Sequence, residues 1–195
     1  KNQNIRALIA DHWKSLELIR NEHFKKTKVF CLIHSKEINH SKDSGLNKRV
    51  INSLHKIKFV IANSNFTKNL AIKIGIPEEK IHIIHPGHDE PMKIENSFQI
   101  ESERLFKDSF PKILTVARLD KRKNHQNVLM CIRNLKEKYP KIKYISIGDG
   151  EEKTRLVSLV KELKIEKEVL FLNHADQKLK TALIKNSNLF LMPSI

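Results

Sequence analysis

Four cationic side chains gather where an apolar run gives way to a helical pattern. The stretch is KILTVARLDKRKNHQNVL, residues 112–129, and its cations are Arg118, Lys121, Arg122 and Lys123. Asp120 is the acidic residue among them, so residues 118–125 carry a formal charge of four minus one, or +3. A planar guanidinium and an ammonium group on one loop suit the two phosphoryl groups of a diphosphate. We therefore predict an anion site here, with Arg118 and Lys123 as its main cations.

The place of this loop in the chain supports the same interpretation. Arg118 follows a predicted buried strand at residues 112–117, and Asn124 is of a type that caps helix N-termini. Lys123 would then lie beside free backbone N–H groups, which themselves attract anions. A basic loop that is merely solvated is the alternative.

A second turn between a predicted strand and a predicted helix reads IGDGEE, residues 147–152. Gly148 and Gly150 permit tight backbone geometry near a ligand, but the turn is not G-x-G-x-x-G because residue 153 is lysine. Glu151 and Glu152 are expected in the first turn of the helix, where they complement its dipole and disfavour a phosphate. The turn is therefore expected to touch an uncharged part of a ligand.

The histidines and cysteines add one catalytic candidate. His34 follows a predicted strand at residues 28–33, and this place at a strand's carboxyl end favours a role in a site, although a lone histidine is more often structural. The other histidines show no spacing typical of a metal site. Cys31 and Cys131 lie in separate apolar stretches, which predicts two buried free thiols. The sequence contains no P-loop, G-x-S-x-G or H-E-x-x-H pattern, which disfavours those enzyme classes.

Short apolar runs alternate with helical patterns along the chain. Strands are predicted at residues 5–10, 28–33, 59–63, 80–84, 112–117, 142–148, 168–172 and 188–192. Helices are predicted at residues 13–24, 46–57, 65–75, 124–139, 151–164 and 177–186. This alternation is typical of α/β units whose parallel sheets are covered on both faces. Residues 86–111 break the rhythm, so we predict a first domain at 1–85, a linker at 86–111 and a second domain at 112–195.

The composition is that of a globular chain with an unusual charge. Hydrophobic residues make up 39% and the formal net charge is +15. Such a charge suits nucleic acid, an anionic membrane or acidic small substrates, and a lysine-rich proteome without a functional cause is the alternative. Aromatic residues are only 6% and are not interleaved with cations as in single-strand binders, so no nucleic-acid partner is expected. Lysine-rich helices suggest instead peripheral attachment to an anionic membrane.

The ends of the chain bear on its location. No apolar run reaches the roughly 18 residues of a membrane span, and no signal-peptide core opens the chain, so a cytoplasmic protein is predicted, peripheral at the inner membrane face. The chain begins with Lys1 rather than Met and stops on a predicted strand. We therefore expect a piece of a longer protein.

A series of segments, in order and spacing, resembles the family 4 glycosyltransferases of GT-B fold. They are FVIANSNFTKNLAIKIGIPEEKIHIIHPGHD, ILTVARLDKRKNHQNVL, YISIGDGEEKTRLVSLVKEL, VLFLNHA and LFLMPS, within about residues 28–194. The resemblance implies two Rossmann-like parallel-sheet domains facing a cleft, both incomplete here. It also implies transfer of a sugar, with retention of configuration, from a nucleotide-diphosphate sugar to an acceptor glycan or lipid. No metal or other cofactor is expected.

The resemblance also assigns site residues. Arg118 and Lys123 match the cations that grip the donor diphosphate and stabilise the leaving phosphate, and His34 matches the first-domain histidine at the reacting sugar. The remaining donor-binding positions that it implies are Gly148, Asp149, Gly150, Asn173 and His174. Ser64 and Asn65 belong to a first-domain motif that is expected to cap a helix.

The chain departs from the family pattern in several places. It has Asn173 where the family usually has glycine and Glu151 where it often has proline. In the family a Glu-x7-Glu pair that holds the donor sugar follows shortly after the PS motif, and the given sequence stops at Ile195, before that position. The glycine-rich loop that opens the first domain is also missing. The fragment alone is therefore expected to be inactive. A basic α/β module that binds phosphate-bearing ligands or an anionic membrane, without catalysis, is the alternative function.

Overall fold

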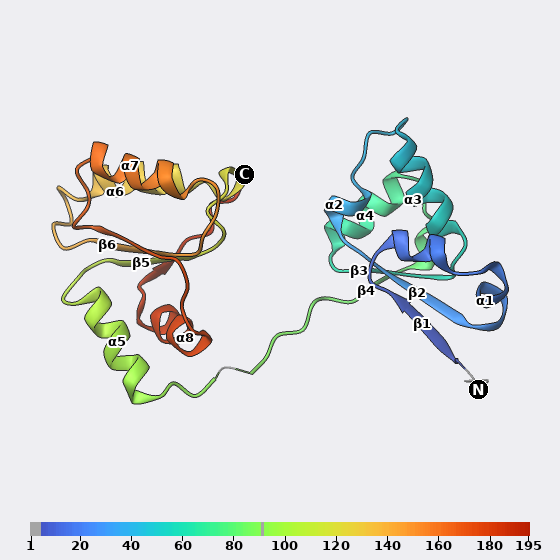
Figure 1. The fold of residues 1–195 in the computed structure, drawn as a ribbon, viewed down its shortest axis with the longest axis horizontal. Coiled ribbons are helices and arrows are strands. Elements are labelled where there is room, and N and C mark those ends of the chain that lie inside the picture. The colour runs from blue at the N-terminus through green and yellow to red at the C-terminus, as the bar shows by residue number, and fades with distance from the viewer. Residues whose placement is uncertain (1–4, 91) are drawn as a thin grey trace. The chain divides into compact units, whose positions relative to one another are not determined.

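The computed structural model describes residues 5–90 and 92–195. Residues 1–4 and 91, which belong to the predicted first domain and linker, lie outside the described residues. The chain forms two compact units, residues 1–88 and 89–195 (Figure 1). Each unit is built on a four-stranded, all-parallel sheet with helices, so the predicted α/β fold class is confirmed.

The first unit has the strand order β1-β2-β3-β4. Its elements are β1 (Ala7–Ala10), the 3-10 helix η1 (Trp13–Leu18), α1 (Asn21–Lys26), β2 (Lys28–Ile33), α2 (Ser35–Ile38), α3 (Gly45–His55), β3 (Phe59–Ala62), α4 (Asn65–Lys73), the 3-10 helix η2 (Glu78–Lys80) and β4 (Ile81–Ile83). Helices α2, α3 and α4 lie on one side of the sheet (Figure 1). Alternate strand residues therefore point into one core, which includes Val29, Cys31 and Ile33.

Two sequence predictions differ in this unit. Residues 13–24 form no single helix, because the backbone at Ile19 is extended and separates η1 from α1. The prediction that the sheet is covered on both faces also fails among the described residues of this unit. On the face away from the core, Ile9 is 71% exposed and the half-buried rings of Phe30 and Phe59 stack at 4.9 Å between centroids.

The second unit has the strand order β7-β6-β5-β8. Its elements are α5 (Asn96–Phe106), β5 (Lys112–Val116), the 3-10 helix η3 (Lys121–Lys123), α6 (His125–Leu135), β6 (Lys143–Ile147), α7 (Lys153–Glu162), β7 (Val169–Leu172), α8 (Gln177–Asn186) and β8 (Leu189–Phe190). Helices α6 and α7 cover one face of this sheet, and α5 and α8 cover the other (Figure 1). Two apolar layers therefore hold the sheet between them, as the near-continuous apolar strands predicted.

Helix α5 lies inside the stretch that the sequence analysis placed in the linker. Phe98, Ser102 and Phe106 recur every four residues and turn toward the core, where Ser102 and Phe106 are fully buried. A serine at the central position interrupts the apolar period, which is why the helix was not predicted. The Ser102 hydroxyl donates to the Gln99 carbonyl at 3.0 Å and accepts from the Asn186 amide of α8 at 3.2 Å. These two bonds satisfy the buried hydroxyl.

The two cysteines have different surroundings. Cys31 is fully buried, and burial raises the pKa of its thiol to about 12. Cys131 on α6 is exposed, so the prediction of two buried thiols is wrong for this one. Its neighbour Ile132 takes the core-facing position of the helix instead.

No helix within the described residues is long and apolar enough to cross a membrane.

Candidate functional site

The strand order of the second unit marks one place where loops converge. The chain runs outward from β5 through β6 to β7 and then returns to β8 on the other side of β5. Ligands of open α/β sheets bind beyond the carboxyl ends of the strands at such a reversal. The loop after β5 carries Arg118, and the segment after β8 contacts it: the Ile195 N–H donates to the Arg122 carbonyl at 2.8 Å.

The loop after β5 is held by an aspartate rather than by the asparagine that was predicted to cap the next helix. The Asp120 carboxylate accepts from the Lys123 N–H at 3.2 Å and so caps η3. Asn124 makes no side-chain capping bond, because it adopts a left-handed conformation, with φ 54° and ψ 33°, between η3 and α6. The cap at Asp120 therefore fixes the basic segment one turn earlier than expected.

The four cations of this loop differ in their partners. Arg122 pairs with Asp120 at 3.4 Å. Desolvation of Asp120 would raise the pKa of its carboxyl, but Arg122, the Lys123 N–H and Arg118 outweigh that effect and lower the pKa. Arg118 is exposed and, among the described residues, forms no salt bridge. Lys123 is half-buried and donates to the Ser194 hydroxyl at 3.3 Å. Neither predicted anion-binding cation thus forms a salt bridge with a carboxylate in the described part of the chain.

The glycine turn after β6 packs directly on the loop that carries Arg118. The Leu119 N–H donates to the Asp149 carbonyl at 3.0 Å, and the Leu119 carbonyl accepts from the Glu152 N–H at 3.0 Å. A Cβ at Gly148 would lie 1.9 Å from the Ala117 carbonyl oxygen, and one at Gly150 would lie 2.5 Å from that of Leu119. These two glycines therefore permit the close approach of the loops, while the Asp149 side chain between them is exposed.

The residues after β7 lie at the same edge of the sheet. Asn173 and His174 are exposed and follow the strand that pairs with β6, and the Gly148 N–H donates to the Leu172 carbonyl at 2.8 Å. The structure thus brings Arg118, Lys123, the glycine turn and Asn173–His174 to consecutive loops at one sheet edge.

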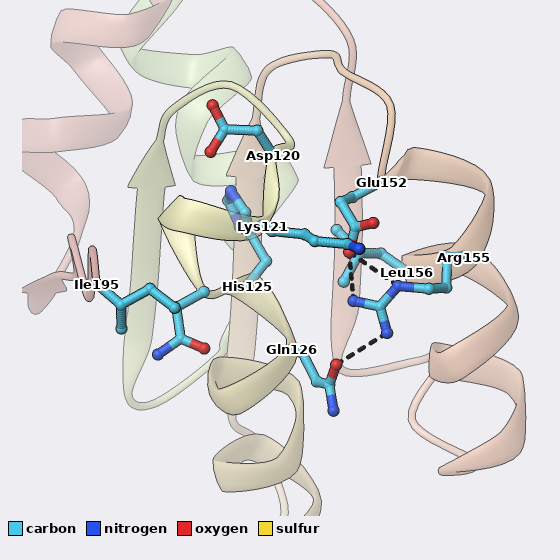
Figure 2. A pocket seen from close by; sticks show the side chains of 9 residues that line it. Asp120, Lys121, His125, Gln126, Glu152, Arg155, Leu156 and Ile195 are labelled. Atoms are coloured by element: carbon cyan, nitrogen blue, oxygen red, sulfur yellow. Dashed lines mark hydrogen bonds and ion pairs between the residues drawn. The ribbon is translucent and has the colours of Figure 1, made fainter. Parts of the chain in front are cut away.

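Both glutamates of the glycine turn lie before the helix and not in its first turn, where they were predicted. Helix α7 begins at Lys153, so Glu152 is its N-cap residue and Glu151 precedes it. Glu152 is buried, and its carboxylate accepts from the Arg155 Nε at 2.8 Å. Arg155 also donates to the Gln126 amide oxygen at 2.8 Å and thereby bridges α7 to α6 (Figure 2). The charge of Glu152 is therefore neutralised by a side chain of its own helix.

A cavity of about 370 Å³ lies beside the basic loop, and Figure 2 shows the side chains that line it. Its lining residues are Asp120, Lys121, Asn124, His125, Gln126, Glu152, Arg155, Leu156 and Ile195. The predicted cations Arg118 and Lys123 are not among them, although both belong to the loop that borders it. Within the described residues, no group of three or more histidine, cysteine, aspartate or glutamate side chains could hold a metal ion.

His125 is a residue that the sequence analysis did not single out. It is 2% exposed, and its Nε2 lies 3.2 Å from the Arg118 carbonyl, which can only accept a hydrogen bond. Its Nδ1 lies 3.2 Å from the Tyr144 hydroxyl. Burial lowers the pKa of the His125 imidazole, against the opposing effects of the Arg118 carbonyl and Asp120. A neutral histidine therefore anchors the backbone at Arg118, and no local sequence pattern indicates this contact.

This histidine predicts a loss of stability in mild acid. The pKa of His125 in the folded unit is below the unfolded value of about 6.5. The contribution of His125 to the free energy of unfolding is therefore fully present above that value and is lost as the pH falls below it. We expect the melting temperature of the second unit to fall more between about pH 7.5 and 5.5 in the wild type than in His125→Gln. Hydrogen exchange of the β5 and β6 amides, followed as the temperature rises, measures the melting temperature of the second unit. His55→Gln, at an exposed histidine, is the control, and equal pH slopes for all three proteins would contradict the prediction.

His34 lies in the first unit, where the loops after β2, β3 and β4 meet. It directly precedes α2 and is exposed, and its Nδ1 lies 3.1 Å from the Asn63 amide nitrogen. His85 Nδ1 lies 3.3 Å from the Asn63 carbonyl oxygen. Ser64 caps α4, as predicted, by accepting from the Thr67 N–H at 3.2 Å, while Asn65 is the first residue of that helix. The contact to Asn63 was not predicted, because it joins residues 29 positions apart.

The chain matches two family models that together cover most of its length. Residues 96–195 match the model described as glycosyl transferases group 1, and residues 2–90 match the model for glycosyltransferase family 4. The first match alone covers more than half of the chain.

Similar proteins agree with these matches. An uncharacterized glycosyltransferase of Methanocaldococcus jannaschii is 34% identical over 91 residues, which are 47% of this chain and 22% of that protein. N-acetylgalactosamine-N,N'-diacetylbacillosaminyl-diphospho-undecaprenol 4-alpha-N-acetylgalactosaminyltransferase of Campylobacter jejuni is 34% identical over 133 residues, which are 67% of this chain and 34% of that protein.

A solved structure supports the fold. The Anabaena protein HepE, crystallised with UDP, superposes with a TM-score of 0.80 at 19% identity, over 97% of this chain and 53% of that one. The chain thus spans about half of that protein and about a third or less of the curated relatives that it matches. Its two parallel four-stranded sheets are those of GT-B glycosyltransferases. The chain belongs to the glycosyl transferases group 1 family.

Proposed function

We propose that this chain belongs to an enzyme that transfers a sugar from a nucleotide-diphosphate sugar to an acceptor glycan or lipid. The observation that carries the proposal is the loop after β5, where Arg118 and Lys123 hold unpaired positive charge at the reversal of the strand order. That is the place where open α/β sheets bind ligands. The family to which the chain belongs and the UDP bound to its relative HepE support the same substrate class.

The chemistry follows from where charge develops. As the bond between the sugar and the diphosphate breaks, negative charge builds on the phosphate that leaves. Cations placed there in advance lower the barrier because they need no reorganisation during the reaction. In the proposal Arg118 supplies a planar fork for two phosphate oxygens and Lys123 supplies a point charge. The sugar keeps its anomeric configuration, and no metal ion is required for the charge that these side chains neutralise.

The other predicted residues take the remaining roles. Gly148, Asp149 and Gly150 line the donor, and Asn173–His174 face its nucleobase from the next loop. His34 acts at the reacting sugar from the first unit. The Campylobacter relative is named for a diphospho-undecaprenol substrate, which supports a lipid-linked glycan as the acceptor.

Isothermal titration of the protein with UDP, uridine and inorganic phosphate tests the donor site. We expect UDP to bind at least about tenfold more tightly than either fragment, because the site contacts both the diphosphate and the nucleoside. The preference should persist at about 0.5 M salt, where surface charges are screened. If UDP and phosphate bind equally weakly and the binding disappears at high salt, the donor site is contradicted and the loop is only a basic surface.

We also propose peripheral association with anionic membranes. The formal charge of +15 supports it, since lysines near an anionic surface each contribute about 1 kcal/mol at low salt. Flotation of the protein with vesicles of anionic phospholipid should recover it at low salt and release it at high salt. Recovery that is the same with neutral vesicles would contradict an electrostatic attachment.

A further inference from the structure

The loop after β3 and the first turn of α4 place a chain of polar side chains next to His34. The Asn63 amide nitrogen lies 3.1 Å from His34 Nδ1. On its other side, the Asn63 amide oxygen accepts from the Thr67 hydroxyl at 2.7 Å and from the Ser64 hydroxyl at 3.4 Å. Thr67 is 1% exposed, so its hydroxyl depends on a partner within the protein.

The hydroxyl groups decide which way the Asn63 amide faces. The Ser64 oxygen already accepts from the Thr67 N–H, and the Ser64 and Thr67 hydroxyls lie 3.1 Å apart. With the amide oxygen toward them, Thr67 donates to Asn63 while Ser64 donates to Thr67 or to Asn63. With the amide reversed, its N–H would donate to Thr67 and Thr67 would donate to Ser64, which would leave the Ser64 proton without an acceptor. The first arrangement gives both hydroxyl protons an acceptor within the protein, so the Asn63 N–H faces His34.

We propose that Asn63 is a positioning residue that holds His34 as the tautomer protonated on Nε2. A nitrogen that receives the Asn63 N–H must present a lone pair, so Nδ1 of the neutral ring is the acceptor and Nε2 bears the proton. His34 then offers a hydrogen-bond donor to a ligand and no basic nitrogen. The role of His34 at a sugar rests on the proposed function. The tautomer does not, because it follows from contacts within the folded first unit.

The tautomer limits what His34 can do. A neutral Nε2–H donates to a sugar hydroxyl or a phosphate oxygen but does not remove a proton as a general base. Thr67 holds the Asn63 amide, and the amide N–H restrains the ring by meeting the Nδ1 lone pair. His34 is thereby oriented by the loop after β3, although it stands after β2.

Nitrogen-15 NMR of the histidine rings tests the proposal directly. The spectrum is recorded at about pH 8.5, which is above the ordinary range of imidazole titration. The protonated and unprotonated nitrogens of a neutral ring resonate far apart. His34→Gln identifies the His34 signals among those of the ten histidines. We expect the Nε2–H tautomer in the wild type; a ring protonated on Nδ1 would overturn the proposal.

A nearly isosteric variant should reverse the tautomer. In Asn63→Asp the carboxylate still accepts from Thr67 but can only accept from His34, so the His34 proton should move to Nδ1. Asn69→Asp changes an exposed asparagine on α4, the helix that follows the Asn63 loop. It adds the same charge outside the network and should leave the tautomer unchanged. An unchanged tautomer in Asn63→Asp would contradict the proposal, while the wild-type spectrum decides it even if that variant does not fold.

Activity separates this proposal from the proposed function. In the product of the whole gene, Asn63→Asp should slow sugar transfer at least about tenfold, because a misoriented group loses its contact in the transition state. Its affinity for UDP should stay within about twofold of the wild type. If the wild type binds no UDP and transfers no sugar, the proposed function fails while the tautomer result stands. Normal transfer in a variant with a reversed tautomer would overturn the positioning role of Asn63.

Discussion

Arg118→Ala is expected to slow sugar transfer by the product of the whole gene about 10²- to 10³-fold, or about 2.7–4 kcal/mol of transition-state stabilisation. The guanidinium would be lost from the place where negative charge develops on the leaving phosphate. Lys123→Ala should have a similar effect, because its ammonium group lies on the same loop and has no carboxylate partner among the described residues. Initial rates with a nucleotide sugar at saturating acceptor measure both.

Lys121→Ala is the matched control for these variants. Lys121 is exposed on the same loop, borders the cavity of Figure 2 and carries the same charge. Its removal should change the rate only a few-fold, since it lies outside the predicted diphosphate contacts. Because Arg118 is exposed, its loss should leave the melting temperature within about 2 °C of the wild type. If Arg118→Ala transferred sugar as fast as Lys121→Ala, Arg118 would not be a donor-binding residue.

Gly148→Ala is expected to destabilise the second unit by about 3 kcal/mol or more. The glycine has a φ of 150°, a conformation that costs other residues about 1–3 kcal/mol. Its new Cβ would also meet the Ala117 carbonyl oxygen at 1.9 Å, and backbone cannot yield as a flexible side chain does. Relief of that overlap costs about 1–3 kcal/mol more. The loop that carries Arg118 would shift as the two turns separate, so activity should fall as well.

The first unit serves as an internal control when the stability of the second unit is measured. Trp13 is the only tryptophan, and it lies in the first unit, so its fluorescence in urea follows that unit. Hydrogen exchange of β5 and β6 follows the second unit. Gly148→Ala should change the exchange and leave the tryptophan transition in place. Gly45→Ala, where a Cβ meets nothing within 4 Å, should be neutral or slightly stabilising at the start of α3. Equal stability of the second unit in both variants would show that the close approach at Gly148 is not required.

Local patterns were enough to predict where most elements and loops lie. Each predicted strand overlaps an observed one, because buried parallel strands are short apolar runs that the sequence shows directly. The same patterns put Arg118 and Lys123 after β5 and the glycine turn after β6. Helix α5 was missed because a buried serine occupies one of its core positions, and a hydrogen bond from another helix satisfies that serine.

The sequence by itself determined the α/β class, the basic loop and the glycine turn, since each depends on residues close together in the chain. Tertiary structure alone decided what holds these parts: His125 under the Arg118 backbone, the glycine turn against Leu119, and Asn63 behind His34. The Asp120 cap of η3 is a local contact that the sequence analysis missed, because it expected Asn124 to cap the next helix. The physical reason is that hydrophobic period and turn chemistry are local, whereas the partner of a polar group is set by which loops the strand order brings to one edge of the sheet.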